Sequence, residues 1–390
     1  TTGTFSAVSG DGFFLNTSGG VITANLPAGS AGAIVSFADY AGTWQTNAVT
    51  VTPNGTDKIG SVNVSVTLNT EGQSVTFVFV DSTQGWINTM DSTSNVRGNP
   101  NLVATGGTIT ESGNFKIHTF TGPGTFTVTN ASATAAENTV GYMVLAGGGG
   151  GAGRAGGGGG AGGFREGRNV PIDNFTASPL VANAPTNAVT VSVQAYPITV
   201  GGAGAPGPSD ESLGGNGNPS IFATITSTGG GGGSYIAGNP GGSGGGGGRT
   251  SPNAAGNGNT PTVNPSQGNN GGTGQAPAQL AGGGGAGGGG TPAASQTGGG
   301  PGGNGVATSI TGSPVTRAGG GGASRPNSPP EPDATGTGGS GGGGDGGCGS
   351  PGSACAATVN TGSGGGGGFS ASGTGGAGGS GLVVIRYKYK

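Results

Sequence analysis

Short runs of alternating apolar and polar residues, separated by turn residues, fill the first 95 positions of the chain. Residues 62–68 alternate strictly, which predicts a strand with one buried face, and the more hydrophobic residues 74–80 predict a central strand. Further strands are expected at residues 12–16, 21–26, 33–37 and 48–52. Trp44 and Trp86 each follow a turn and are expected to cap a small core. Residues 1–95 are therefore predicted to form a small all-β module of the β-sandwich type.

A short linker is expected at residues 96–107, after which β character resumes. Strands are predicted at residues 115–121, 125–130 and 140–146, with Gly122-Pro123-Gly124 as a hairpin turn between the first two. The composition then changes sharply at Gly147. The first 146 residues contain 19 glycines and the remaining residues contain 82. A second domain, residues 108–390, is therefore predicted.

The glycines of this second domain occur in short tracts, each interrupted by a turn rich in Pro, Asn or Ser. The tracts are residues 147–163, 229–233, 241–248, 282–290, 298–305, 319–322, 336–347, 362–368 and 373–381. A flexible linker has no reason to break and resume in this way. Extended polyglycine II helices, with three residues per turn and outward-pointing amides, offer a folded alternative. Several helices must pair together, because lateral hydrogen bonds have to offset the entropic cost of ordering glycine.

Predicted strands at residues 189–193, 196–200, 220–226, 306–310 and 382–387 are interleaved with the tracts. The expected fold is therefore all-β plus polyglycine II. A small N-terminal β-sandwich module precedes a β layer that anchors a bundle of polyglycine II helices.

The composition narrows the classes of function. Glycine (101 of 390 residues) and proline (24) together normally indicate low complexity, yet only 7% of residues are charged, which is low for a disordered chain. The net charge is −3 and no basic stripe is present, so no nucleic-acid partner is expected. No apolar run is long enough to span a bilayer. The chain begins at Thr1 without a methionine, which suggests a fragment or a processed chain.

Residues suited to catalysis or metal binding are scarce, so neither an enzyme, a cofactor nor a metal site is expected. The one histidine, His118, lies on a predicted strand and is interpreted as a half-buried strand residue. Two acidic pairs, Asp210-Glu211 and Glu331 with Asp333, have the chemistry of catalytic carboxylates or calcium ligands, but no ligand loop surrounds them, and solvated loop charges are favoured. Cys348 and Cys355 either close a small disulfide loop or remain free thiols.

Several motifs resemble bacteriophage tail-fibre proteins. FTGPGTFTV (120–128) and YMVLAGGG (142–149) resemble the entry to their C-terminal glycine-rich domain, and YPITVG (196–201) and GSGLVVIRY (379–387) resemble its middle and closing motifs. GDGFF (10–14), DYAGT (39–43) and GQSV (72–75) resemble a small β module of marine and cyanobacterial phage tail fibres. The second domain is also similar to glycine-rich phage tip adhesins, whose polyglycine II helices display variable recognition loops. Those adhesins attach to a separate fibre protein, whereas here the glycine-rich domain is fused to its own module.

The resemblance implies a trimeric fibre segment, an extracellular virion location, and contact with other phage tail proteins. Its expected partner is a bacterial surface protein or polysaccharide. If the strands form one end of the bundle, alternation places residues 152–155, 205–213, 234–240, 291–297, 324–333 and 369–372 at the far end. Residues 249–281 and the cysteine loop are expected at the strand end. The candidate receptor-binding residues are Arg154, Asp210, Glu211, Tyr235, Ile236, Asn239, Gln296, Arg325, Glu331, Asp333 and Phe369.

The function expected from these features is attachment of a virion to a bacterial host through the far-end loops. One alternative is a purely structural fibre or decoration protein of the virion. Another is an ice-binding protein with a flat glycine-rich face, although the tracts here are irregular and the loops long.

Overall fold

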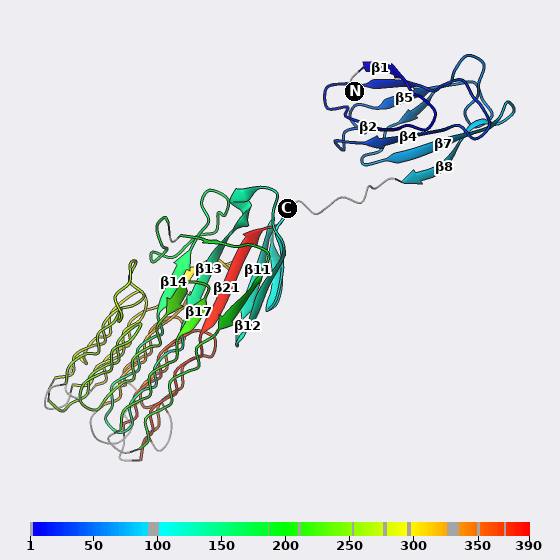
Figure 1. The fold of residues 1–390 in the computed structure, drawn as a ribbon. Helices are drawn as coiled ribbons and strands as arrows, with labels where there is room; N and C mark the ends of the chain where they lie inside the picture. The colour runs from blue at the N-terminus through cyan, green and yellow to red at the C-terminus, as the bar shows by residue number, and fades with distance from the viewer. Residues whose placement is uncertain are drawn as a thin grey trace. The chain divides into compact units, whose positions relative to one another are not determined.

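The computed structural model describes residues 3–92, 101–185, 187–209, 212–251, 253–275, 279–294, 298–325, 335–348, 352–369 and 372–390. The chain divides into two compact units, Thr1–Gly98 and Asn99–Lys390, each of which is described by itself. Both units are built from β-strands and extended backbone (Figure 1). The expected all-β fold is therefore confirmed.

The first unit is a β-sandwich of two four-stranded sheets. Its strands are β1 (Gly3–Ser6), β2 (Gly12–Leu15), β3 (Ile22–Asn25), β4 (Ile34–Asp39), β5 (Val49–Thr52), β6 (Val66–Leu68), β7 (Ser74–Asp81) and β8 (Gly85–Ser92). One sheet has the order β1-β3-β5-β6 and the other β2-β4-β7-β8. Because the chain alternates between sheets from β1 to β5, neighbouring strands such as β3 and β5 run parallel.

The core between these two sheets contains both tryptophans. Trp44 and Trp86 are fully buried, and Trp86 makes an edge contact with Phe79 at 5.5 Å between ring centroids. The buried carboxylate of Asp39 accepts backbone N–H bonds from Gly42 and from Gly72. One carboxylate thus ties together two turns, which the alternation pattern alone did not indicate.

The strictly alternating segment 62–68 is a strand only at Val66–Leu68, so the longer prediction is wrong. Val62 and Val64 are exposed. The side-chain amide of Asn63 donates to the carbonyls of Gly55 and Asp57, which fastens this segment to a loop instead of a neighbouring strand. Local hydrogen bonds of this kind compete with sheet pairing.

The second unit begins with two stacked sheets. Its strands are β9 (Val103–Thr105), β10 (Thr108–Ser112), β11 (Phe115–Phe120), β12 (Gly124–Asn130), β13 (Thr139–Leu145), β14 (Phe164–Gly167), β15 (Val189–Thr190), β16 (Ala195–Thr199), β17 (Ser220–Phe222), β18 (Ile225–Ser227), β19 (Val306–Thr308), β20 (Val315–Arg317) and β21 (Leu382–Lys388). One sheet has the order β10-β11-β21-β13-β14, with β15 paired to β13, and the other β18-β17-β16-β12-β9. The C-terminal strand β21 lies between β11 and β13 (Figure 1).

Two expectations about this region are corrected. Residues 103–105 of the expected linker form β9, which pairs with β12, and Leu102 is buried in the core, so the second unit begins earlier than predicted. The residues Gly122-Pro123-Gly124 do not close a hairpin. They carry the chain from β11 in one sheet to β12 in the other, because β11 pairs with β10 and β21 while β12 pairs with β16 and β9.

His118 lies in the core between these sheets and is fully buried, not half-buried. Its Nδ1 lies 2.7 Å from the carbonyl of Gly106, which can only accept, so Nδ1 carries the proton and Nε2 accepts the Tyr387 hydroxyl at 3.3 Å. Burial lowers the pKa of His118 and raises the pKa of Tyr387 to about 12. Both groups are therefore held neutral.

Extended runs leave and return to the strand end of these sheets, and together they form the glycine bundle (the described residues of 146–163, 200–219, 228–305 and 318–381; Figure 1). Hydrogen bonds from the first run go to three neighbouring runs in rotation. To the run at 157–163, Ala146, Gly149 and Ala152 donate to Gly163, Gly160 and Gly157. To the run at 212–218, Gly147, Gly150 and Gly153 donate to Asn218, Gly215 and Ser212. To the run at 373–379, Gly148, Gly151 and Arg154 donate to Gly379, Gly376 and Gly373. A partner that recurs every third residue is what a three-residue-per-turn extended helix such as polyglycine II gives.

The carbonyls of the same run are bonded with the same period. Gly147 and Gly150 accept from Gly230 and Gly233, Gly148 and Gly151 from Gly204 and Gly207, and Gly149 and Ala152 from Gly365 and Gly368. The first run is thus surrounded by other runs, antiparallel where it donates and parallel where it accepts. The backbone of the bundle interior satisfies its own polar groups without water.

At many glycines of the interior the spacing of these runs leaves no room for a side chain. A Cβ added at Gly149 would collide with the carbonyl of Gly231, and one at Gly159 with the carbonyl of Gly149. At Gly288 the nearest heavy atom to such a Cβ would be the Asn304 nitrogen at 3.7 Å, an ordinary contact. Glycine is therefore required at some positions of the bundle and dispensable at others.

This contrast gives a matched pair of variants. Gly149→Ala should lower the melting temperature by several degrees, because neighbouring backbones must move at a cost of about 1–3 kcal/mol. Gly288→Ala should leave it unchanged or slightly raised, because alanine restricts the unfolded chain. Calorimetry of the full chain measures both, and equal shifts would contradict the close-packed lattice.

The neutral, buried His118 gives a pH dependence. A lowered pKa means that the folded state resists protonation, so its contribution to stability is present above the ordinary pKa of about 6.5 and is lost as the pH falls below it. His118→Gln removes the titrating group. The difference in unfolding free energy between the unmodified protein and this variant should shrink by up to about 1.4 kcal/mol between about pH 7.5 and about pH 5.5.

Denaturant unfolding at the two pH values measures that difference, and every other titrating group is common to both proteins. A difference that stays constant would show that His118 is not held neutral by the fold.

Candidate recognition surface at the far end of the glycine bundle

The far end of the glycine bundle is where its runs reverse, away from the strands (Figure 1). The first reversal is tight: the run that leaves β13 turns at residues 152–155, and the Ala152 N–H bonds to the carbonyl of Gly157. Arg154 and Ala155 take positive φ angles of 28° and 49° there. Non-glycine residues seldom adopt this backbone region, so the turn is held by the runs on either side of it.

A later reversal brings Tyr235 and Ile236 to the far end. The Ser234 hydroxyl accepts the N–H of Ile236 at 2.8 Å, which closes the turn. Tyr235 is buried against Ala155 and Leu280, whereas Ile236 is 44% exposed. A small apolar cluster therefore stiffens the far end, and an apolar side chain faces solvent beside it.

Arg249 lies beside this turn, at the next far-end reversal of the chain, which the sequence interpretation missed. Its Nε donates to the Tyr235 hydroxyl at 3.0 Å, and its guanidinium lies 5.4 Å from the centroid of the Tyr235 ring. The cation is thus stacked on an aromatic ring and fixed by a hydrogen bond. The sequence held one signal for this position. Residues 238–241 are themselves a returning run and not part of the loop, so the chain has a further reversal to make at Arg249.

The expectation that residues 249–281 lie at the strand end is wrong for much of the segment. Gly256 and Asn259 donate to Gly245 and Gly242, so residues 253–259 return toward the strands. Gly271 and Gly274 then donate to Gly256 and Asn253, so the chain goes out again. These runs contain Asn and Ala because they lie where side chains face solvent, and counting only pure glycine tracts overlooks them.

The cysteines form a disulfide, which resolves the two alternatives left by the sequence. The bridge lies at the far end and not at the strand end, because the Phe369 N–H bonds to the carbonyl of Gly352 at 2.9 Å. The tract 336–347 is not one run: Gly341 and Gly342 take φ angles of 102° and 107° and reverse the chain. This additional turn moves the cysteine loop to the opposite end.

The other predicted site residues divide into three groups. Arg154, Tyr235, Ile236, Arg325 and Phe369 lie at far-end turns, although Arg325 is 7% exposed and mostly covered. Asn239 belongs to the lattice itself, since its N–H bonds to Gly232 and its side-chain amide to Asn216. Asp210, Glu211, Gln296, Glu331 and Asp333 lie outside the described residues. The far-end surface is hereafter Arg154, Ile236, Arg249, Cys348 and Phe369 with their turns.

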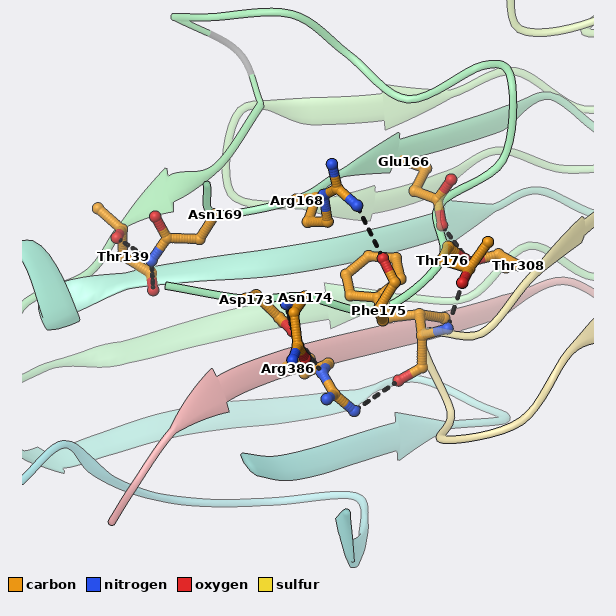
Figure 2. A network of polar contacts seen from close by, with 11 residues as sticks. Thr139, Glu166, Arg168, Asn169, Asp173, Asn174, Phe175, Thr176, Thr308 and Arg386 are labelled. Atoms are coloured by element: carbon orange, nitrogen blue, oxygen red, sulfur yellow. Dashed lines mark hydrogen bonds and ion pairs between the residues drawn. The ribbon is translucent and has the colours of Figure 1, made fainter. Parts of the chain in front are cut away.

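A buried polar network supports the sheet from which the bundle leaves (Figure 2). Arg386 of β21 donates through Nε to both carboxylate oxygens of Asp173 at 3.0 Å, and its guanidinium lies 4.4 Å from the centroid of the Phe115 ring. Asp173 belongs to the segment that follows β14. The ion pair therefore fastens this segment to β21. Removal of one partner of such a pair is costly, because the other charge is left buried.

Glu166 of β14 is the second anchor of this network (Figure 2). It is 1% exposed, and its carboxyl accepts the Ser178 N–H at 2.6 Å and the Thr308 hydroxyl. Burial raises the pKa of Glu166, and these hydrogen bonds offset part of that rise. Both oxygens have protein donors, so the carboxyl serves to fasten the segment and β19 to the sheet.

The described residues also bear on metal binding and on membrane insertion. No group of three or more His, Cys, Asp or Glu side chains gathers there in a way that could hold a metal ion. Within the same part of the chain, no helix has the length and apolar character needed to cross a bilayer.

Comparison with known protein families places most of the second unit in one of them. Residues 119–388 match a protein family described as a glycine-rich domain. The match runs from the end of β11 to the end of β21 and so takes in most of the two sheets and the whole glycine bundle. No curated protein matches the chain.

Proposed function

The chain belongs to the glycine-rich domain family, and from this premise we propose that it is a receptor-binding protein of a bacteriophage tail fibre. In this proposal the far-end surface attaches the virion to a bacterial surface protein or polysaccharide. The protein acts by binding and not by catalysis. Its association into a trimer and with other phage tail proteins belongs to the proposal and rests on the sequence resemblance.

The observation that carries the proposal is a set of unlike side chains on turns held by a rigid backbone lattice. Ile236 is an exposed apolar side chain, Arg249 a cation stacked on Tyr235, and Arg154 a second cation on a neighbouring turn. Binding residues are commonly found on loops positioned by a rigid scaffold. A purely architectural bundle would have no need of such variety at one end.

Preorganisation adds to this argument. Every backbone N–H from Ala146 to Arg154 is bonded to a neighbouring run, and the disulfide ties the cysteine loop at the same end. A surface that is ordered before contact does not lose loop entropy on binding. Aromatic and arginine side chains supply much of the binding energy at protein interfaces, and both occur here.

The test compares one exposed residue at each end of the bundle. Ile236 and Val359 are both exposed aliphatic residues, but Val359 lies at a turn beside the strands. In binding of the labelled full chain to a panel of bacterial strains, Ile236→Asp should weaken binding by about tenfold or more. Val359→Asp should leave binding unchanged.

Melting temperatures of both variants serve as the control for folding. Binding to no strain of the panel, or an equal loss in the two variants, would contradict attachment through the far end. The second outcome would favour a structural role for the bundle.

A further inference from the structure

A cavity of about 350 Å³ opens into the first unit, far along the chain from the glycine bundle. It lies between β6, the edge strand of one sheet, and β7 and β8 at the edge of the other. Leu68, Phe77 and Trp86 form an apolar lining, and Gln73, Asn88 and Asp91 contribute polar groups. This size and this mixture of groups are those of a site for a small molecule.

Gln73 is held in one orientation by its neighbour. Its Nε2 donates to the Asp91 carboxylate at 3.1 Å, and because a carboxylate only accepts, the assignment of the two amide atoms is settled. The amide oxygen of Gln73 is buried and has no hydrogen-bond partner among the described residues. Leaving a buried acceptor unpaired costs about 1–3 kcal/mol.

Trp86 has an unpaired hydrogen-bond donor where Gln73 has an unpaired acceptor. Its ring is fully buried, and its indole N–H is a donor without a partner in the described part of the chain. One orphaned acceptor and one orphaned donor therefore belong to two residues that line the same cavity. Unsatisfied buried groups in a folded protein need an explanation, and a ligand or water is one of them. The Trp44 N–H is also unpaired, but Trp44 does not line the cavity, so the pairing of an acceptor with a donor at one cavity is what distinguishes this site.

From these features we propose that the cavity binds a neutral sugar unit. A hydroxyl is both donor and acceptor, so sugar hydroxyls match the unpaired Gln73 oxygen and the unpaired Trp86 N–H, which small side-chain movements must uncover because both atoms are buried. The apolar lining suits the C–H face of a sugar ring. The exposed carboxylate of Asp91 disfavours an anionic ligand and accepts from further hydroxyls. This site is independent of the far-end surface and does not rest on the function proposed for it.

Tryptophan fluorescence of the full chain gives a direct readout. The chain has two tryptophans, and Trp44 is not among the residues that line the cavity, so Trp44→Phe leaves Trp86 as the only reporter. This protein is titrated with D-glucose, D-galactose, D-mannose, L-rhamnose and N-acetyl-D-glucosamine, each to about 50 mM, and calorimetry repeats any positive titration. A saturable change with at least one of these sugars is expected.

A pair of glutamine variants then tests the site. Gln73→Met keeps the side-chain length but removes the orphaned oxygen, and should weaken sugar binding by about tenfold or more without a loss of melting temperature. Gln45→Met changes an exposed glutamine outside the cavity and should bind as the parent does. No saturable change with any of the five sugars, or binding that survives Gln73→Met unaltered, would overturn the proposal.

Discussion

Sideways hydrogen bonding between backbones is the interaction on which the second unit depends. A single extended glycine run has no internal hydrogen bonds and a large entropy to lose, so it gains order only from its neighbours. In the first run each amide from Ala146 to Arg154 finds a partner, and the partners recur every third residue. At positions such as Gly149 and Gly159 the same geometry excludes any side chain. Glycine content, close spacing and rigidity are thus three consequences of one constraint. The same lateral hydrogen bonds hold the far-end turns in position.

The sheets fix the register of the runs, which the runs alone cannot fix. β13 leads directly into the first run, and the last run leads directly into β21, which pairs with β13. At the seam, the hydroxyls of Ser220 and Ser227 donate to the carbonyls of Leu145 and Val144. The buried ion pair of Arg386 with Asp173 fastens the segment after β14 to this sheet. An apolar core with directional polar contacts therefore fixes where each run begins, and the lattice extends that order to the far end.

The sequence indicated most strands and the presence of a bundle, because alternation and glycine tracts are local signals. It did not reveal the order of the sheets or β9, which depend on pairing between distant segments. It misplaced the cysteine loop because the tract 336–347 contains a reversal at Gly341 and Gly342. It misplaced Arg249 because solvent-facing runs need glycine only at the positions that face the bundle. Residues 201–207 show this rule: Gly201, Gly204 and Gly207 are buried, while Ala203 and Pro206 are exposed. At the far-end surface the residue types were foreseeable, but the stacking of Arg249 on Tyr235 was not.

Site-resolved hydrogen exchange of the backbone amides tests the lattice most directly. In the first run, the amides from Gly147 to Gly153 should all exchange slowly, because each is bonded to a neighbouring run. In the solvent-facing run, Gly204 and Gly207 donate to Gly148 and Gly151 and should be protected. The N–H groups of Gly202 and Ala203 have no acceptor among the described residues and should exchange fast. Uniformly fast exchange in both runs would contradict the account, since the runs would then be coil without a scaffold.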